Sequence, residues 1–598
     1  MLDVQTYQRW PNLCALFLDT AARRGDAPCL WRRDGRAWRA LSWREVLEQV
    51  TRLAQGLEAL GVLRGERVAI VAENRPEWLV AELAILALGA VAVPAYVTNT
   101  EDDHRHVLDN AGVGYAIVSR AALAAVLAPA AVASARCRTL IALDLFESPA
   151  PNLRVVSWDA VLQSGAHAPR ALDARIERIA RDDLAVIFHT SGTGGRPRGV
   201  MLTHGSILAN CLGAWERLHP RLDYGREVFL SFLPLSHAYE HATGQFTALS
   251  IGAQIHYCES IDRLLGDLAS VRPTILTVVP RLFETLHART TWTVKRQGRL
   301  RAWLFDTAVG IGARQVAGQR LTPWAWLFDR TAGRRVRAGF AALLGGRLKF
   351  FVSGGAPLNL EVARFFAALG VQVLQGYGQT EAGPVIACNP PEHARLDSVG
   401  PPLAGVELRL ADDGEICVRG ELVMRGYCND EDTTRQALAD GWLHTGDIGE
   451  LDADGHLRIT DRKKDIIVNS GGDNIAPQRV EGFLTLQPEI GQAMVYGDRR
   501  PHLVALLVPR EEFLRDWNAR HGGHLTVGDA GGDPAFVAHL EAVVKRLNAT
   551  LAPAERVRRF ALAEQPFTVQ NGLLTPSMKI RRHLITAAYV ERLAALYT

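Results

Sequence analysis

The sequence predicts an α/β fold, in which a large N-terminal domain with parallel-rich sheets precedes a small C-terminal α/β domain. The 598 residues are too many for one ordinary hydrophobic core, so two or more domains are expected. Short apolar strands alternate with helical patterns over residues 1–180, which is typical of parallel sheets with crossover helices. A charged run at 461–465 favours a domain boundary, because few apolar contacts could cross it.

The elements of the first domain follow from the period of the apolar residues. Helices are expected over 43–60, 77–88 and 102–110, and strands over 67–72, 90–94 and 114–119. The apolar stretch 79–96 contains Glu82, a glycine and a proline. It therefore indicates a buried helix-to-strand unit and not a membrane span.

Composition and charge favour a soluble globular protein of a reducing compartment. Hydrophobic residues make up 48% of the chain and charged residues 22%. The net charge of +3 argues against a nucleic-acid binder driven by bulk electrostatics. No secretory signal is apparent at the N-terminus, and the eight cysteines lack C-x-x-C spacing, so a cytoplasmic location is expected.

A loop rich in hydroxyls and glycines follows the apolar run 184–188, and 202–210 then has helix-compatible composition. The loop residues are Thr190, Ser191, Gly192, Thr193, Gly194 and Gly195, followed by Arg196 and Arg198. Exposed backbone N–H groups, hydroxyls and guanidinium groups suit a polyphosphate. Val200 stands where the Walker pattern requires lysine, and Pro197 where the dinucleotide fingerprint requires glycine. A glycine-rich surface hairpin is the alternative.

His237, Glu240 and His241 form an H-x-x-E-H pattern, which gives a rival hypothesis of a zinc peptidase. Such an enzyme needs two imidazoles on one helix face, a third ligand and a catalytic carboxylate. The pattern directly follows a proline-bounded strand, and matches of five residues arise by chance in long chains. We interpret it as a chance match.

The segment 283–346 is helical, cationic and bears tryptophans. An inserted helical hairpin with a solvated basic face is the main interpretation, and a membrane-surface helix is the alternative. The strands at 348–353 and 371–375 then run into loops of small residues, where ligands of open α/β sheets collect. There Tyr377 offers a flat face to a base, and Glu381 offers oxygen ligands for Mg²⁺. Ordinary strand-to-helix turns are the alternative for both loops.

Turn-rich sequence at 405–460 predicts a small β subdomain. Within it, Asp447 is a good partner for a ribose diol, because its two oxygens can accept from adjacent hydroxyls. Near the end of the chain, Lys579 lies between Thr-Pro-Ser and Arg-Arg and suggests a presented, anion-seeking loop.

These motifs, in this order, resemble those of the acyl-CoA synthetases, an adenylate-forming, AMP-binding family, over nearly the whole chain. HTSGTGGRPRGVMLTH resembles the family's phosphate loop, and SGGAPL and GYGQTE resemble its adenine-side motifs. The stretch beginning DGWLHTGDIGE and ending DRKKDIIVNSGG resembles the fatty-acid synthetase signature and hinge, and LTPSMKIRR resembles the C-terminal lysine motif. The helical insert is similar to that of long-chain members.

The resemblance implies how the chain is divided. The N-terminal adenylation domain would span 1–461, including the helical insert at about 283–346 and the β subdomain at about 400–461. The hinge would be 462–464, and the mobile C-terminal domain would be 465–598.

The resemblance also implies an AMP-forming long-chain fatty acid–CoA ligase that releases AMP and pyrophosphate. Lys579, Glu381 and His237 would be catalytic, Thr190 and Glu381 would hold Mg²⁺, and the small domain would rotate about Lys464. The implied ATP-binding residues are Thr190, Ser191, Gly192, Thr193, Gly194, Gly195, Arg198, Gly355, Ala356, Gly376, Tyr377, Gly378, Gln379, Thr380, Asp447 and Arg462.

Two residues depart from the family's pattern. Gly194 stands where a hydroxyl residue is usual, and Arg198 stands where lysine is common, so an altered affinity for ATP is expected. The expected partners are a fatty acid, ATP and CoA, without nucleic acid. A fatty-acyl-AMP ligase that delivers to a carrier protein and a non-catalytic acyl-binding protein are the alternatives. Peripheral contact with the inner membrane face is left open.

Overall fold

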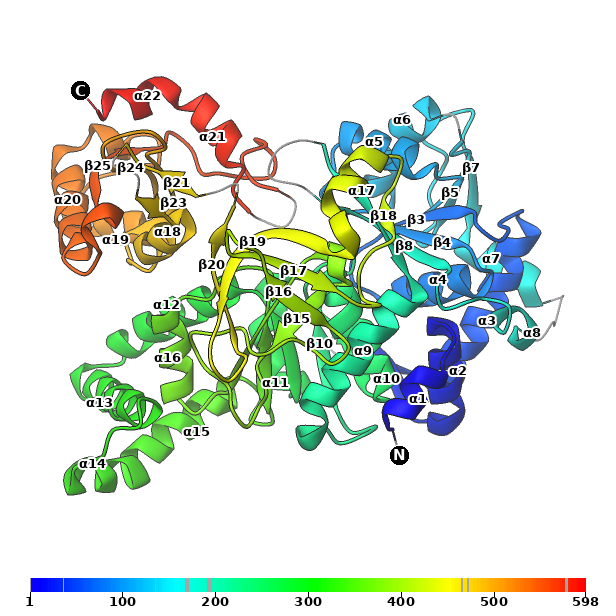
Figure 1. Cartoon of the computed structure of the whole chain (residues 1–598), viewed down its shortest axis with the longest axis horizontal. Coiled ribbons are helices and arrows are strands. Elements are labelled where there is room, and N and C mark those ends of the chain that lie inside the picture. The colour runs from blue at the N-terminus through cyan, green and yellow to red at the C-terminus, as the bar shows by residue number, and fades with distance from the viewer. Residues whose placement is uncertain are drawn as a thin grey trace.

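The structure is a computed structural model, and it describes residues 2–35, 37–134, 136–166, 172–190, 196–463, 466–470, 473–575 and 579–597. Positions 261, 295 and 474 are described by their backbone alone. The larger, N-terminal part holds two eight-stranded sheets, and the C-terminal part packs as a separate lobe against it (Figure 1).

The first large sheet contains the strand before the glycine-rich loop. Its order is β18 (Gly426–Tyr427), β9 (Arg198–Thr203), β8 (Leu184–Thr190), β4 (Val91–Pro94), β3 (Arg67–Val71), β5 (Tyr115–Val118), β6 (Thr139–Ala142) and β7 (Arg154–Ser157). The strands from β8 to β7 pair in parallel, whereas β8, β9 and β18 pair antiparallel. Helices α3 (Trp43–Ala59), α5 (Glu101–Ala111) and α6 (Ala121–Ala133) accompany this sheet.

The second large sheet carries the other two strand-to-loop motifs. Its order is β15 (Val385–Cys388), β14 (Val373–Gly378), β13 (Phe350–Ser353), β12 (Ile275–Val278), β10 (Val228–Ser231), β11 (Gln254–Tyr257), β1 (Pro28–Asp34) and β2 (Ala37–Ser42). The strands from β14 to β1 pair in parallel, and only the two ends pair antiparallel.

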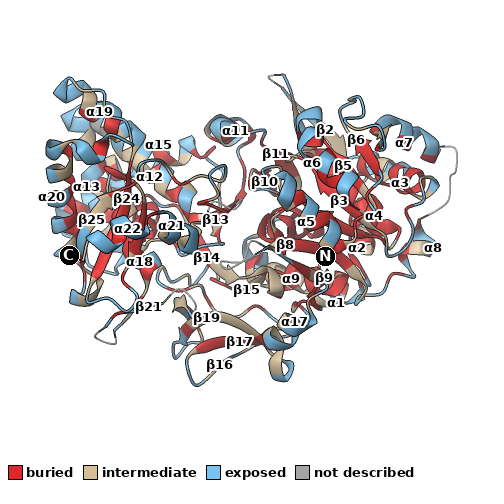
Figure 2. Ribbon diagram, turned by 90° about the horizontal axis from the view of Figure 1, so that it is seen from above, coloured by how far each residue is buried: buried red, intermediate tan, exposed pale blue. Residues whose placement is uncertain are grey.

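Helix α4 (Pro76–Ala87) lies between the two sheets and contacts β4 of one and β1 of the other. All of its residues except Glu77 are buried, as expected for a helix that is apolar around its whole circumference. It leads into β4, so the expected buried helix-to-strand unit at 79–96 is confirmed. Figure 2 shows that buried residues concentrate in the sheets and exposed ones on the outer helices. Among the described residues, no helix is long and apolar enough to cross a membrane.

A four-stranded antiparallel sheet follows, formed by β16 (Glu407–Leu410), β17 (Glu415–Arg419), β19 (Leu443–Leu451) and β20 (Leu457–Arg462). The C-terminal part contains the strands β23 (Ile490–Tyr496), β24 (Leu503–Pro509) and β25 (Val557–Leu562). Helices α18 (Pro477–Thr485), α19 (Glu511–His521), α20 (Pro534–Asn548), α21 (Arg582–Ala588) and α22 (Val590–Ala595) complete it. The expected α/β architecture is therefore confirmed.

Between β12 and β13 the chain forms a helical lobe at the lower left of Figure 1. It consists of α12 (Pro280–Arg296), α13 (Arg299–Val316), α14 (Pro323–Phe328), a π-helical turn (Asp329–Gly333) and α15 (Arg334–Leu343). A small core of its own, with Ala308, Ile311, Ala325 and Phe328, holds this lobe together.

One expected boundary differs from the structure. Helix α9 (His204–Leu218) begins two residues later than the helical segment expected from 202, and residues 198–203 form β9 instead. Val200 and Leu202 are buried where β9 pairs with β8, so sheet pairing prevails over local helix preference.

Candidate active site

The glycine-rich segment connects β8 to β9, which pair antiparallel. Thr190, the last residue of β8, pairs with Arg198, the first residue of β9. Strands β8 and β9 therefore pair as a hairpin, and this pairing is compatible with the predicted phosphate loop because it places a hydroxyl and a guanidinium group at the ends of the two strands. The loop residues Ser191, Gly192, Thr193, Gly194 and Gly195 lie outside the described residues.

Glu381 lies on a 3₁₀ turn (Thr380–Ala382) directly after β14, in the other large sheet. Its carboxylate accepts a hydrogen bond of 2.9 Å from the hydroxyl of Tyr427. Tyr427 belongs to β18, which pairs with β9, so it joins the loop of one sheet to the carboxylate of the other. The Arg198 guanidinium lies over the Tyr427 ring, 5.4 Å from its centroid, and 3.9 Å from Asp430.

Sequence analysis missed Tyr427, although the tyrosine stands beside Gly426 in a turn-rich segment. Gly426 has a φ of 148°, and a Cβ there would lie 2.7 Å from Thr434. A glycine followed by a large aromatic was the available signal, but it does not reveal that the hydroxyl would meet Glu381.

The residues present fit a magnesium–nucleotide site of the usual kind. No group of three or more His, Cys, Asp or Glu side chains within the described ranges could hold a metal ion by itself. Mg²⁺ is commonly held by one or two protein carboxylates together with substrate phosphates. Glu381 is a carboxylate that could serve in this way.

The loops after β13 and β14 share one edge of their sheet, since Ser353 pairs with Gln375. Gly355 and Ala356 are exposed in the first loop, and Gly355 has a φ of 82° that favours glycine. Two further expected residues, Gln379 and Thr380, follow the end of β14. The Gln379 side-chain nitrogen is buried and makes no hydrogen bond to described residues, so it can donate to a base.

Gly376 and Gly378 lie within β14, and Gly378 has a strict packing requirement. A Cβ at this position would stand 1.9 Å from the backbone oxygen of Pro384. Only glycine fits there, so the strand can approach its antiparallel neighbour β15 closely at the point where it enters the site.

Asp447 is buried and is held by both of its oxygens. It accepts 2.7 Å from the Tyr377 hydroxyl and 3.1 Å from Arg462 Nε, which lies opposite it on β20. Burial, and then the charge of Asp447, raise the pKa of Tyr377 well above its usual range. Each carboxylate oxygen has a second lone pair, so the network orients Asp447 and still lets it accept from a diol.

His237 precedes the π-helix at Glu240–Phe246, and its Nδ1 accepts 3.2 Å from the Tyr239 backbone N–H. Burial, and then the positive charge of Lys579, lower the pKa of His237 to about 4. Lys579 is exposed and comes from the C-terminal lobe, in a loop closed by the Leu574–Ile580 bridge. The structure therefore brings His237 and Lys579, 342 positions apart in the sequence, close enough to interact electrostatically.

The H-x-x-E-H pattern does not assemble a metal site. Glu240 accepts 2.6 Å from the Thr277 hydroxyl, and His241 is bonded to the buried Glu82. Burial raises the pKa of Glu240 to about 7. Both side chains are buried with separate partners, so nothing in this geometry supports the zinc peptidase.

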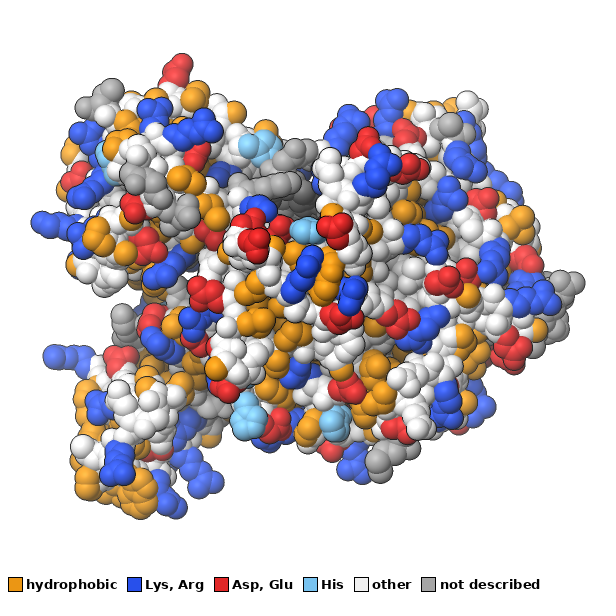
Figure 3. Space-filling view, in the orientation of Figure 1, with side chains coloured by type: hydrophobic (Ala, Val, Ile, Leu, Met, Phe, Trp, Pro, Cys, Tyr) orange, Lys and Arg blue, Asp and Glu red, His pale blue; other side chains and the backbone are white. Residues whose placement is uncertain are grey.

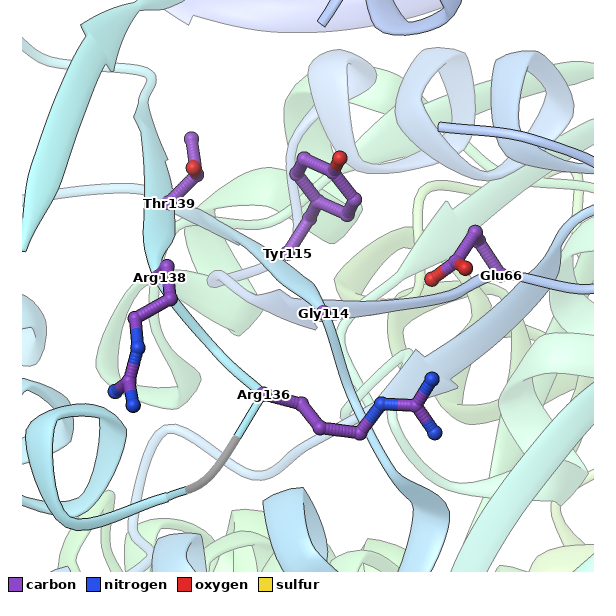
Figure 4. A pocket seen from close by; sticks show the side chains of 6 residues that line it. All are labelled: Glu66, Gly114, Tyr115, Arg136, Arg138 and Thr139. Atoms are coloured by element: carbon purple, nitrogen blue, oxygen red, sulfur yellow. The ribbon is translucent and has the colours of Figure 1, made fainter. Parts of the chain in front are cut away.

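A shallow hollow lies at the amino ends of β3, β5 and β6, whereas the loops of the candidate site follow carboxyl ends of strands. It is lined by Glu66, Gly114, Tyr115, Arg136, Arg138 and Thr139 (Figure 4). The side chains splay apart and do not converge on one point, so this hollow offers no focused chemistry. Lys464, the expected pivot, lies outside the described residues.

Comparison with protein families finds two successive matches. The family described as AMP-binding enzyme matches residues 17–428, and the AMP-binding enzyme C-terminal domain matches residues 464–598.

Named relatives match over most of their length. A protein of Mycobacterium tuberculosis named long-chain-fatty-acid–CoA ligase FadD15 is 34% identical over 94% of this chain and 92% of its own. Human long-chain-fatty-acid–CoA ligase 6 is 31% identical over 96% of this chain and 85% of its own. The adenylation domain of a carboxylate reductase from Mycobacterium chelonae has the same fold, with a TM-score of 0.78 at 24% identity over 98% of this chain and 91% of its own.

Proposed function

Because the chain belongs to the AMP-binding enzyme family, we propose that it is an AMP-forming ligase that joins a long-chain fatty acid to CoA. Relatives named long-chain-fatty-acid–CoA ligase, similar over almost the whole chain, support this proposal. The structural observation that supports it is the hydrogen bond from Tyr427 to Glu381, which joins the loop after β14 to the sheet that contains β8 and β9. We further propose that the enzyme acts in the cytoplasm, with peripheral contact to the inner membrane face and no nucleic-acid partner.

In the first half-reaction, a carboxylate oxygen of the fatty acid attacks the α-phosphorus of ATP. The bond from the α-phosphorus to the bridging oxygen breaks, and pyrophosphate leaves with the electron pair. Lys579 would neutralise the carboxylate and the α-phosphate as their charges approach. His237 is neutral because of its lowered pKa, so it would position the carboxylate by a hydrogen bond and not by charge.

ATP would lie across the loops of both sheets. Residues 190–195 and Arg198 would hold the β- and γ-phosphates, and Thr190 and Glu381 would hold Mg²⁺, which supplies positive charge beside them. Gly355, Ala356 and residues 376–380 would line the adenine and α-phosphate. Asp447 and Arg462 would bind the ribose, because Tyr377 and Arg462 already orient the carboxylate.

In the second half-reaction, the thiol of CoA attacks the acyl carbonyl carbon. The thiol loses its proton to water as the thioester bond forms, the bond from the acyl carbon to the AMP oxygen breaks, and AMP leaves with the electron pair. We propose that the C-terminal domain rotates about Lys464 between the two steps, withdrawing Lys579 and admitting the thiol. Such closure and reopening would keep water from the adenylate.

The proposal is tested by exchange of labelled pyrophosphate into ATP across a series of fatty-acid lengths, followed by addition of CoA. Exchange with long-chain acids and thioester formation with CoA are expected. Exchange with none of the acids would refute the proposal. If exchange occurs but no thioester forms with CoA, and an added acyl carrier protein accepts the acyl group, the protein is a fatty-acyl-AMP ligase instead.

Lys579→Ala separates the two steps. We expect this variant to lose pyrophosphate exchange, while it still forms acyl-CoA from supplied acyl-adenylate. Lys545→Ala is a suitable control, because Lys545 is an exposed lysine of the same domain on α20. Loss of both half-reactions in Lys579→Ala would contradict the domain rotation.

A further inference from the structure

The helical lobe, residues 281–347, has a charge unlike that of the rest of the chain. It contains 13 lysine and arginine residues and three acidic residues, so its net charge is +10. The whole chain carries +3, which leaves −7 for everything outside the lobe. So strong a separation of charge indicates an anionic partner for this lobe.

The same lobe exposes tryptophan. Among the described residues, the exposed tryptophans all lie in this lobe, at Trp292, Trp303, Trp324 and Trp326. Trp303 is 51% exposed, Trp324 57% and Trp326 52%. We define the tryptophan patch by its exposed side chains, which are Leu300, Trp303, Trp324, Trp326 and Leu327.

The patch draws on two helices that share one surface. Trp303 of α13 and Trp324 of α14 both contact the Phe328 ring, with centroids 5.9 and 5.4 Å away. Leu327 follows Trp324 by three positions and therefore lies on the same side of its helix. At roughly 200 Å² for each side chain, three half-exposed indoles alone present about 300 Å². Figure 3 shows apolar side chains gathered on this lobe, with cationic ones around them.

Arginines border the patch, and acidic groups hardly offset them. Arg330 lies over the Trp326 ring at 4.8 Å, and Arg334 and Arg335 follow at the start of α15, both exposed. Asp329 is already paired with Arg337 at 2.6 Å. The lobe therefore presents exposed indoles with guanidinium groups next to them.

We propose that the tryptophan patch docks the protein on an anionic lipid bilayer, with the indoles at the interface and the arginines at the headgroups. Indole rings favour the membrane–water interface, and basic clusters are attracted to anionic lipids. A second copy would set two lobes of +10 against each other, which disfavours self-association through this face. The inference rests on the proposed function, since it names the lipid surface for the membrane contact proposed there.

The test uses the full chain without ATP, fatty acid or CoA, mixed with phosphatidylcholine vesicles with or without phosphatidylglycerol. Binding is measured by co-sedimentation and by the blue shift of tryptophan fluorescence. We expect binding to anionic vesicles that weakens at high salt, and little binding to neutral ones.

Three variants define the surface. Trp324→Ser with Leu327→Ser should lower the partition coefficient by roughly tenfold, since binding scales with buried apolar area. Arg334→Gln with Arg335→Gln should lower it about fivefold for each charge. Leu63→Ser with Leu145→Ser is the matched control, because both leucines are exposed elsewhere on the protein. This control should bind like the unaltered chain.

Equal binding of the unaltered chain to neutral and anionic vesicles would overturn the proposal, as would unaltered binding of the arginine variant. A tryptophan variant that changes only the oligomeric mass would assign the patch to a second copy and refute lipid docking. The arginine variant alters exposed charges alone, so it keeps the test decisive if the tryptophan variant fails to fold. Pyrophosphate exchange is measured separately, so failure of the ligase and failure of docking are distinguishable.

Discussion

Tyr427→Phe removes one hydroxyl from the candidate site and leaves the aromatic ring in place. The lost group donates 2.9 Å to Glu381, and the ring beneath Arg198 is retained. Hydrogen bonds to charged groups contribute about 1.5–3 kcal/mol. Tyr427 is 8% exposed, so water can replace little of this interaction from the tyrosine side.

If Tyr427 orients the Glu381 carboxylate toward Mg²⁺, the loss of this hydrogen bond should slow the reaction. A loss of 1.5–3 kcal/mol corresponds to about a 10- to 150-fold lower kcat/KM in pyrophosphate exchange. The concentration of Mg²⁺ needed for half-maximal exchange should rise, as should the Kd of magnesium–ATP measured by calorimetry. The free energy of unfolding should change little, because Glu381 is partly exposed and can be solvated.

The chain offers a matched control in Tyr377→Phe. This change also removes a tyrosine hydroxyl bonded to a carboxylate, 2.7 Å from Asp447. Because Asp447 is assigned to the ribose, we expect a higher KM for ATP and an unaltered requirement for Mg²⁺. The reasoning would be refuted if Tyr427→Phe left the Mg²⁺ requirement unchanged, or if both variants shifted it equally.

Two further predictions concern stability. Burial lowers the pKa of His189 to about 3 and of His204 to about 4. As the pH falls below 6.5, these histidines therefore take up protons in the unfolded chain before they do so in the folded one. Each histidine should lower the free energy of unfolding by about 1 kcal/mol per pH unit below 6.5. Urea unfolding near pH 7.5 and 5.5 would measure this loss. The same slope in His189→Gln as in the unaltered chain would contradict this assignment. Gly378→Ala should lower the free energy of unfolding by about 3 kcal/mol or more, because its Cβ would clash with Pro384. Gly339→Ala on α15 is the control, since open space surrounds this position, and it should leave stability unchanged or raise it by about 0.5–1 kcal/mol. Thermal melts measure both changes. A Gly378→Ala variant as stable as the parent would show that the strand pair can separate.

Sequence patterns predicted those parts of the fold that depend on residues near one another in the chain. The alternation of apolar strands with amphipathic helices identified the α/β class, and the sequence of α4 predicted its burial, since a helix apolar all round must be covered. The strand at 198–203 was missed because its own residues do not determine it. Its pairing with β8 does, and that pairing cannot be read from the segment alone. Tyr427 was missed for the same reason: its partner Glu381 lies 46 positions away.

The sequence alone determined the chemistry available, namely a loop of hydroxyls and glycines, a carboxylate after a strand, and a lysine near the C-terminus. The tertiary structure decided which of these groups meet. It brought Lys579 close enough to His237 for an electrostatic interaction, joined the two sheets through Tyr427, and gave Glu240 and His241 separate buried partners. The physical reason is that residue type and spacing fix the donors, acceptors and charges of a chain. Distances between groups on different elements depend instead on how sheets pair and how domains pack.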